Sequence, residues 1–208
     1  MREKERATRV IYVRHGQADF PYDRLYCDDR EDPPLTAEGR EQAGQAAHLL
    51  QGEEVDVIYA SPMQRTRTTA EVIAGKNGAA LQCHDQLKER PFGIWDGLYF
   101  DAIARDYPDE FLAWKQDPVN FVPPGGETIS DHRDRVIGAV AEIKGRHRGQ
   151  TIVIVAHVGP IRMCITDALR MPLDGYRQLT IDYGALTRID YGKHQDNLIF
   201  LNYRQWAD

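Results

Sequence analysis

Segments with the spacing of strands alternate with segments that have the spacing of helices along most of this chain. Residues 151–156 constrain the fold most, because Thr-Ile-Val-Ile-Val-Ala is a continuous apolar run. Such a run is typical of a central parallel strand that is buried on both faces. Parallel strands need helical crossovers between them. The pattern therefore predicts a three-layer α/β/α fold with a mainly parallel central sheet.

The other strands and helices are predicted from residue type and periodicity. Strands are expected at residues 8–13, 55–60, 81–84, 178–182, 185–190 and 197–203, the last two as a hairpin around Gly192. One helix begins after Thr36 as N-cap and stops near Gly52, and a second takes Ser61-Pro62 as N-cap and first residue and stops at Gly75. A third covers residues 160–169, and a longer one carries the apolar stripe Ile129, Val136, Val140 and Ile143.

Two segments lack this alternation. Residues 17–34 have no helical or strand period and are rich in acidic side chains, and a loop of this length is usually functional. Residues 90–128 are rich in proline and aromatic residues, with short helices expected near 98–106 and 109–116. We interpret residues 90–128 as a small helical cap inserted at one end of the sheet. The whole chain, residues 1–208, is then expected to form a single α/β domain.

Charge and cysteine content narrow the classes of function. The formal net charge is −6, from 26 basic and 32 acidic residues, which argues against a partner that is nucleic acid or an anionic membrane. Cys27, Cys83 and Cys164 are odd in number and widely spaced, as expected for free thiols in a reducing compartment. The first residues contain no apolar signal segment, and no apolar run is long enough to span a bilayer. These features predict a cytoplasmic protein.

Two of the predicted strands end in a histidine that is soon followed by glycine. His15 comes after the first strand, and His157 comes after the central strand. The carboxyl ends of parallel strands meet at one edge of a sheet, where ligands bind, so both imidazoles are expected in the same crevice. A single histidine is more often a packed, hydrogen-bonded residue, but two at equivalent positions favour a functional site.

Arginines accompany these histidines. Arg14 precedes His15, and Arg65 lies in the first turn of the predicted second helix, where its side chain can reach over the helix N-terminus. Arg67 is expected to be exposed to solvent. Guanidinium groups beside a helix N-terminus suit an anion with several oxygens, and phosphate fits best.

Six stretches carry a more specific signal, and they follow one another between residues 10 and about 165. They are Arg14-His15-Gly16-Gln17, Pro34–Ala43, Ser61–Ala70, Glu89–Gly97, Gly125-Gly126-Glu127-Thr128 and His157–Arg162. In this order they resemble the RHG, PLTxxGxxQA, SPxxRxxxTA, ExxxGxWEG, GGES and HGGxIR segments of the histidine phosphatase superfamily, also called the phosphoglycerate mutase-like family. The length is similar to that of the small stand-alone phosphatases of the family.

The resemblance implies a metal-independent reaction with no cofactor. His15 would attack phosphorus as a neutral imidazole and form a phosphohistidine. Arg14, Arg65 and His157 would hold the phosphate oxygens, with Gln17 and the backbone N–H of Val158 as further contacts. Glu89 would protonate the leaving alcohol and then activate water. The substrate would be a small phosphorylated metabolite such as α-ribazole phosphate or a sugar phosphate. Whether two copies of the chain form a homodimer is left open by the sequence.

Some positions depart from the family pattern. Ala18 and Pro21 stand where the family often has threonine and a phosphate-binding asparagine, and Asp96 replaces the usual glutamate. Val158 replaces a glycine, and Pro160 follows Gly159. These changes bear on which substrate is bound more than on the chemistry.

Three alternatives remain at this point. A phosphoglycerate mutase-type phosphoryl transferase would use the same residues but would depend on a phosphorylated primer. A metal-dependent hydrolase could take ligands from His15, His157, Glu89 and the acids of residues 17–34, although the chain lacks a close ligand motif such as HExxH. A binding module without catalysis would have no need for these residues.

Overall fold

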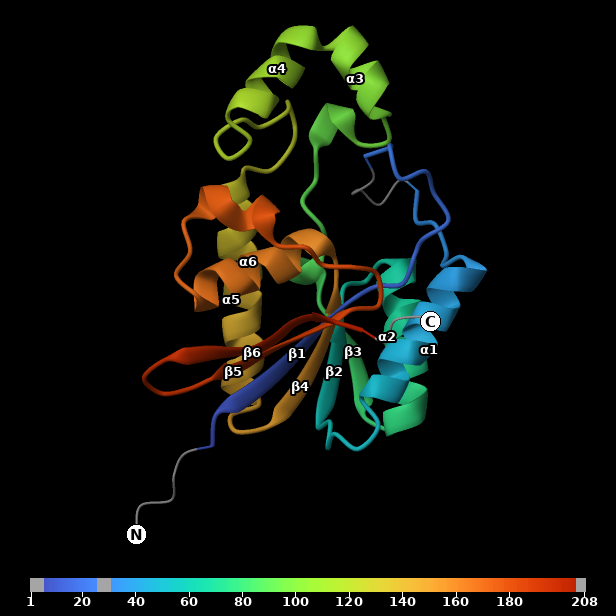
Figure 1. Cartoon of the computed structure of the whole chain (residues 1–208), viewed down its shortest axis with the longest axis vertical. Coiled ribbons are helices and arrows are strands. Elements are labelled where there is room, and N and C mark those ends of the chain that lie inside the picture. The colour runs from blue at the N-terminus through green and yellow to red at the C-terminus, as the bar shows by residue number, and fades with distance from the viewer. Residues whose placement is uncertain (1–5, 26–30, 205–208) are drawn as a thin grey trace.

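The protein, described here by a computed structural model over residues 6–25 and 31–204, has the predicted three-layer α/β/α fold (Figure 1). Six strands form one mixed sheet in the order β3-β2-β4-β1-β5-β6. The strands are β1 (Thr8–Arg14), β2 (Val57–Ala60), β3 (Ala80–Cys83), β4 (Thr151–Ala156), β5 (Leu186–Tyr191) and β6 (Asp196–Tyr203). Strands β1 to β4 pair in parallel, whereas β5 and β6 pair antiparallel.

Helices cover both faces of the sheet, as Figure 1 shows. On one face α1 (Ala37–Leu49) and α2 (Gln64–Asn77) pack against β1, β2 and β4, and on the other lie α5 (Ile129–Arg146) and α6 (Val158–Ala168). All six residues of β4 are buried, which confirms the prediction of a central strand. The stripe of α5, from Ile129 to Ile143, is buried as predicted. No helix among the described residues has the length and apolarity needed to cross a membrane.

Residues 90–128, which we call the cap, rise above the carboxyl ends of the parallel strands (Figure 1). The cap contains α3 (Phe100–Asp106) and α4 (Pro108–Gln116), close to the two predicted helices. Its side chains form a hydrophobic cluster of their own around Trp95, Ile103 and Trp114. The N-terminal loop, which is described over residues 17–25 and 31–34, joins the cap through backbone hydrogen bonds. Leu25 N–H donates to the Leu98 carbonyl, and Phe100 N–H donates to the Asp23 carbonyl.

The predicted start and end of the second helix are wrong. Helix α2 begins at Gln64 rather than at Pro62, and Met63 is its N-cap without a side-chain hydrogen bond. Ser61 does not cap the helix because its hydroxyl bonds to His157. The helix also passes through Gly75 and ends at Asn77, with Gly78 as its C-cap, whose φ of 71° is accessible to glycine without strain.

The predicted strand at residues 178–182 is also wrong. The 3-10 helix η3 (Leu173–Gln178) is followed by extended backbone that joins no strand of the sheet. Two of its carbonyls accept hydrogen bonds from arginines instead: Leu179 from Arg162 Nε at 2.8 Å and Ile181 from an Arg14 terminal nitrogen at 2.6 Å. A polar backbone group that is satisfied by a side chain has no need of a sheet partner.

Other predictions agree with the structure. Thr36 is the N-cap of α1 and accepts the Gly39 N–H, although α1 ends at Leu49, before Gly52. The hairpin of β5 and β6 turns at Gly192. Arg67 is exposed. Cys83 and Cys164 are free thiols, and Cys27 lies outside the described residues.

Candidate active site

The two histidines at the strand ends lie against each other. Strands β1 and β4 are parallel neighbours with Arg14 level with Ala156, so the residues that follow leave the sheet side by side. The His15 and His157 rings are 5.1 Å apart, centroid to centroid, and meet edge to face. Both side chains are almost fully buried. The register of the sheet therefore brings the two imidazoles together, as predicted.

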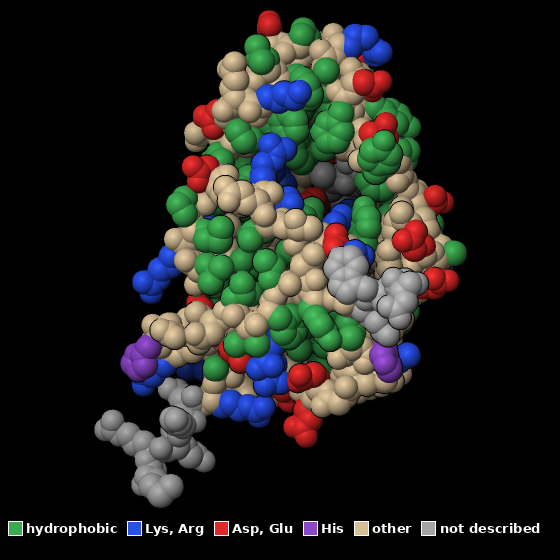
Figure 2. Space-filling view, viewed as in Figure 1, with side chains coloured by type: hydrophobic (Ala, Val, Ile, Leu, Met, Phe, Trp, Pro, Cys, Tyr) green, Lys and Arg blue, Asp and Glu red, His purple; other side chains and the backbone are tan. Residues whose placement is uncertain are grey.

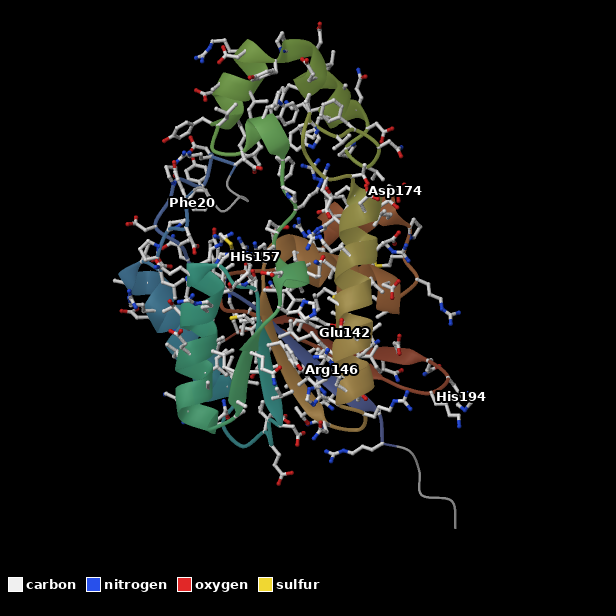
Figure 3. The ribbon with its side chains drawn as sticks, turned by 180° about the vertical axis from the view of Figure 1, so that it is seen from behind. Phe20, Glu142, Arg146, His157, Asp174 and His194 are labelled. Atoms are coloured by element: carbon white, nitrogen blue, oxygen red, sulfur yellow. The ribbon has the colours of Figure 1, made fainter. Side chains whose placement is uncertain are left out.

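A pocket of about 320 Å³ opens above these rings and beneath the cap. Figure 3 shows His157 above the sheet, with the cap beyond it. In Figure 2 the molecule is hollowed between cap and body, with basic and hydrophobic side chains at the rim. The predicted site residues that line the pocket are Arg14, His15, Arg65, Glu89, His157 and Val158.

The glycine that follows His15 is required by close packing. A Cβ on Gly16 would overlap the Gly39 carbonyl oxygen, and a Cβ on Gly39 would overlap the Gln17 carbonyl. The Gly16 N–H donates to the Thr69 hydroxyl on α2 at 3.1 Å. The backbone turn that carries His15 is therefore supported by three of the motifs, namely Arg14–Gln17, Pro34–Ala43 and Ser61–Ala70.

Hydrogen bonding selects the tautomer of His15. Its Nδ1 lies 2.7 Å from the Gly16 carbonyl oxygen, which only accepts hydrogen bonds. We therefore assign the ring proton to Nδ1, which leaves a lone pair on Nε2. Burial, followed by the charges of Arg65 and Arg14, holds the pKa of His15 well below its usual value. The imidazole is neutral, as a nucleophile must be.

His157 has a comparable environment. Its Nε2 lies 2.8 Å from the hydroxyl of Ser61, the residue that follows β2. Burial, followed by Arg65 and His15, holds its pKa well below the usual value. A neutral His157 can share a phosphate site with His15 without charge repulsion between the rings.

Two arginines are held beside the histidines. The Arg14 guanidinium lies 3.8 Å from the ring centroid of Tyr183, a cation–π contact, and Tyr183 also packs beside His15. Arg65 is the second residue of α2 and is 2% exposed, with Asp32 at 3.7 Å. The first-turn placement of Arg65 agrees with the prediction.

The Glu89 carboxylate reaches the same pocket from the segment that leads into the cap. Its side chain is only 13% exposed, and each of its oxygens accepts a backbone N–H at 2.9 Å, one from Arg90 and one from Gly159. Gly159 is in the first turn of α6, so the carboxylate lies at a helix N-terminus. It is a positioned acid rather than an exposed loop residue.

Gln17 and Val158 differ in their relation to the pocket. The Gln17 side-chain oxygen accepts the Thr36 hydroxyl at 2.9 Å, and Gln17 does not line the pocket. Its contact with substrate stays a prediction. Val158 lines the pocket as the first residue of α6, where a backbone N–H has no partner within the helix.

Three further side chains at this site were not predicted from the sequence. Ser61 bonds to His157, Tyr183 stacks on Arg14, and His132 of α5 lines the pocket. The motif at Ser61–Ala70 could have indicated Ser61. Tyr183 follows a misassigned strand, and His132 lies on an otherwise ordinary amphipathic helix, so neither gives a local signal.

The fold and the pocket define a class: an α/β protein with two histidines, two arginines and a glutamate around one pocket at the carboxyl ends of its strands. Residues 10–204 match the histidine phosphatase superfamily (branch 1). This chain belongs to that superfamily.

Individual relatives match nearly the full length of the chain. A protein named phosphoserine phosphatase 1, from Hydrogenobacter thermophilus, is 30% identical over 195 residues, which cover 93% of this chain and 92% of the relative. The crystal structure of a putative α-ribazole-5′-P phosphatase from Escherichia coli superposes with a TM-score of 0.87 at 27% identity, covering 97% and 99% of the two chains. A mycobacterial glucosyl-3-phosphoglycerate phosphatase gives 0.83 at 27% identity, covering 95% and 99%.

Proposed function

We propose that this protein is a phosphomonoesterase that hydrolyses a small phosphorylated metabolite through a phosphohistidine on His15. The observation that carries the proposal is the placement of neutral His15 between Arg14, Arg65 and His157 in one pocket. The names of the three relatives described above, each a phosphatase, support it.

The first step forms a bond between His15 Nε2 and phosphorus and breaks the bond between phosphorus and the alcohol oxygen. Glu89 gives its proton to that oxygen, so the product leaves as a neutral alcohol. In the second step water attacks phosphorus, the nitrogen–phosphorus bond breaks and Glu89 takes a proton from the water. The second step returns both residues to their starting forms.

Phosphoryl transfer depends mainly on positioning and on charge stabilisation. Arg14, Arg65 and His157 supply both, because they surround the place where the phosphate oxygens would lie. The proposal therefore includes no metal and no cofactor. We expect a chelator such as EDTA to leave activity unchanged after dialysis, measured on p-nitrophenyl phosphate. Loss of activity that a divalent ion restores would favour the metal-dependent alternative.

The wall of the pocket on the cap side is aromatic, and it would contact the alcohol half of the substrate. Phe92, Phe100 and Trp114 come from the cap, and Phe20 comes from the loop after β1. These side chains favour an alcohol with a flat or apolar face, as α-ribazole phosphate and several sugar phosphates have. A panel of phosphorylated metabolites that includes phosphoserine would identify the substrate by release of inorganic phosphate.

His15→Ala tests the proposal directly. We expect the variant to lose at least about 10³-fold in kcat, because the covalent route is removed. The measurement is turnover of p-nitrophenyl phosphate, together with acid-quench trapping of a phosphorylated enzyme. His194→Ala, in the exposed β5–β6 turn, is the matched control and should behave like wild type. Unchanged turnover by His15→Ala would remove His15 from the mechanism.

We also place the protein in the cytoplasm, as part of the same proposal. The free thiols of Cys83 and Cys164 support a reducing compartment.

A further inference from the structure

His132 lies in the first turn of α5, and its side chain is 1% exposed. It lines the pocket beside Glu89. A buried imidazole needs hydrogen-bond partners at its nitrogens, since an unsatisfied polar group in the interior is costly. The two nitrogens of His132 face different groups, and the difference suggests a role in the reaction.

The Nδ1 end of His132 is held by an ion pair. Nδ1 lies 3.2 Å from Glu127 Oε2 and 2.8 Å from an Arg135 terminal nitrogen. Arg135 also binds both oxygens of Glu127, at 2.7 and 2.8 Å. Burial would raise the pKa of Glu127, but the hydrogen bonds from Arg135 outweigh it and lower that pKa to about 2. Glu127 is therefore a fixed anion behind the imidazole.

The Nε2 end of His132 points to the proposed acid. Nε2 lies 3.8 Å from Glu89 Oε1 and makes no hydrogen bond among the described residues. The distance is too long for a hydrogen bond, but such contacts in unliganded enzymes often tighten when substrate binds. Gly159 makes the approach feasible, because a Cβ there would overlap Glu89 Oε1 and lie 3.0 Å from Nε2.

Glu127 can accept a hydrogen bond from Nδ1 and Arg135 can donate one to it, so Nδ1 has a partner in either neutral tautomer of His132. With the proton on Nε2, the ring donates to an ionised Glu89 while Nδ1 accepts from Arg135. With the proton on Nδ1, the ring donates to Glu127 while Nε2 accepts from a protonated Glu89. Glu89 must take both forms in the proposed reaction, as acid and as base. His132 therefore suits both.

We propose that His132 is a positioning residue for Glu89, and that it holds the carboxyl group toward the leaving oxygen in both protonation states. The inference rests on the proposed phosphatase function. It predicts that loss of His132 slows esters whose alcohol needs a proton more than esters whose leaving group needs none.

Two variants separate this role from a structural one. His132→Leu removes the ring nitrogens and keeps a buried apolar side chain, whereas His132→Gln places an amide nitrogen near the position of Nε2. We expect His132→Leu to lose about tenfold to hundredfold in kcat on an alkyl phosphate, a part of the 10²–10⁴-fold supplied by general acid catalysis. Its turnover of p-nitrophenyl phosphate, which has a good leaving group, should fall clearly less, and the turnover that remains shows that the chain is folded. His132→Gln should recover most of the loss.

The matched control is His147→Leu. His147 also joins hydrogen bonds, with Tyr59 at 3.0 Å and Gln150 at 2.8 Å, but it lies beyond the far end of α5. It should leave the ratio of the two activities unchanged.

A double variant completes the test. If His132 acts through Glu89, then Glu89→Gln with His132→Leu should be no slower on the alkyl phosphate than Glu89→Gln alone. Equal losses on both esters in His132→Leu, no recovery in His132→Gln, or additive losses in the double variant would overturn this inference alone. A wild-type chain that is inactive on both esters would overturn the proposed function and this inference with it.

Discussion

At the scale of single residues, the protonation states of the two buried histidines depend on the arginines beside them. His15 and His157 are kept neutral first by burial and then by neighbouring guanidinium groups. Arg14 and Arg65, the proposed phosphate-binding residues, therefore also help to keep His15, the proposed nucleophile, unprotonated. One cluster of charge serves both purposes because cations attract the phosphate and disfavour imidazolium at the same time.

The same burial makes stability depend on pH. The unfolded chain takes up protons at these histidines near the ordinary pKa of 6.5, whereas the folded chain does not. Because the unfolded state then binds more protons, the free energy of unfolding is highest above about pH 6.5 and falls as the pH decreases below it. We expect the urea midpoint to decrease between pH 7.5 and 5.5.

His15→Gln should make this decrease smaller, because it removes one group that only the unfolded state protonates. The measurement is urea unfolding of wild type and variant at several pH values. His194→Gln, whose side chain is exposed, serves as the control. An identical pH dependence in wild type and His15→Gln would contradict the low pKa of His15.

At the scale of elements, the start of α2 is stabilised by a residue distant in sequence. Met63 provides no side-chain cap, and instead both carboxylate oxygens of Asp32 accept the Gln64 N–H, at 2.7 and 2.9 Å. Asp32 also lies 3.7 Å from Arg65. The N-terminal loop thus caps α2, the helix that carries Arg65, which we propose binds the phosphate.

Asp32→Ala should destabilise the protein by about 1 kcal/mol, the typical cost of losing a helix N-cap. The urea midpoint at pH 7.5 measures this change. Asp19→Ala removes another acid of the same loop. Its side chain is exposed and is not the cap of α2, so the variant should have little effect. Equal stabilities of the Asp32→Ala and Asp19→Ala variants would show that the capping contact contributes nothing.

At the scale of the whole molecule, the cap and the body have separate hydrophobic clusters. The cap cluster centres on Trp95, whose ring lies 5.4 Å from Phe121 and 6.1 Å from Trp114. The Arg177 guanidinium lies 4.8 Å from the Trp114 ring and links η3 to the cap. That residues 1–208 form a single domain with a cap insertion stays a prediction. Because the two clusters are separate, we expect that the cap can unfold locally while the sheet stays folded.

Trp95→Ala tests this division. Removing a buried tryptophan costs about 3–5 kcal/mol, and we expect the loss to fall on the cap. Hydrogen exchange should become faster over residues 92–121 and stay unchanged in β1 and β4. Ile94→Ala, at a neighbouring exposed position, is the control. Faster exchange throughout the sheet would show that cap and body unfold together.

The layers, the central strand and the positions of the two histidines could all be predicted from the order of the residues. These features follow from local periodicity and from the rule that parallel strands end at one edge, so nearby residues suffice to predict them. The boundaries of α2 were predicted wrongly. Ser61 and Gly75 have the residue types of a helix cap and a helix stop, but Ser61 bonds to His157 and Gly75 lies within the helix. The strand predicted at 178–182 failed because its carbonyls bind arginines from β1 and α6.

The side chains that support the site become evident only when the packing of the whole chain is known. Tyr183 meets Arg14 across 169 positions of sequence, and His132 meets Glu89 across 43. Neither contact leaves a local pattern, because each depends on how α5, α6 and the segment after η3 pack together. Strand and helix formation is driven by neighbours along the chain, whereas the surroundings of a reactive group are set by neighbours in space.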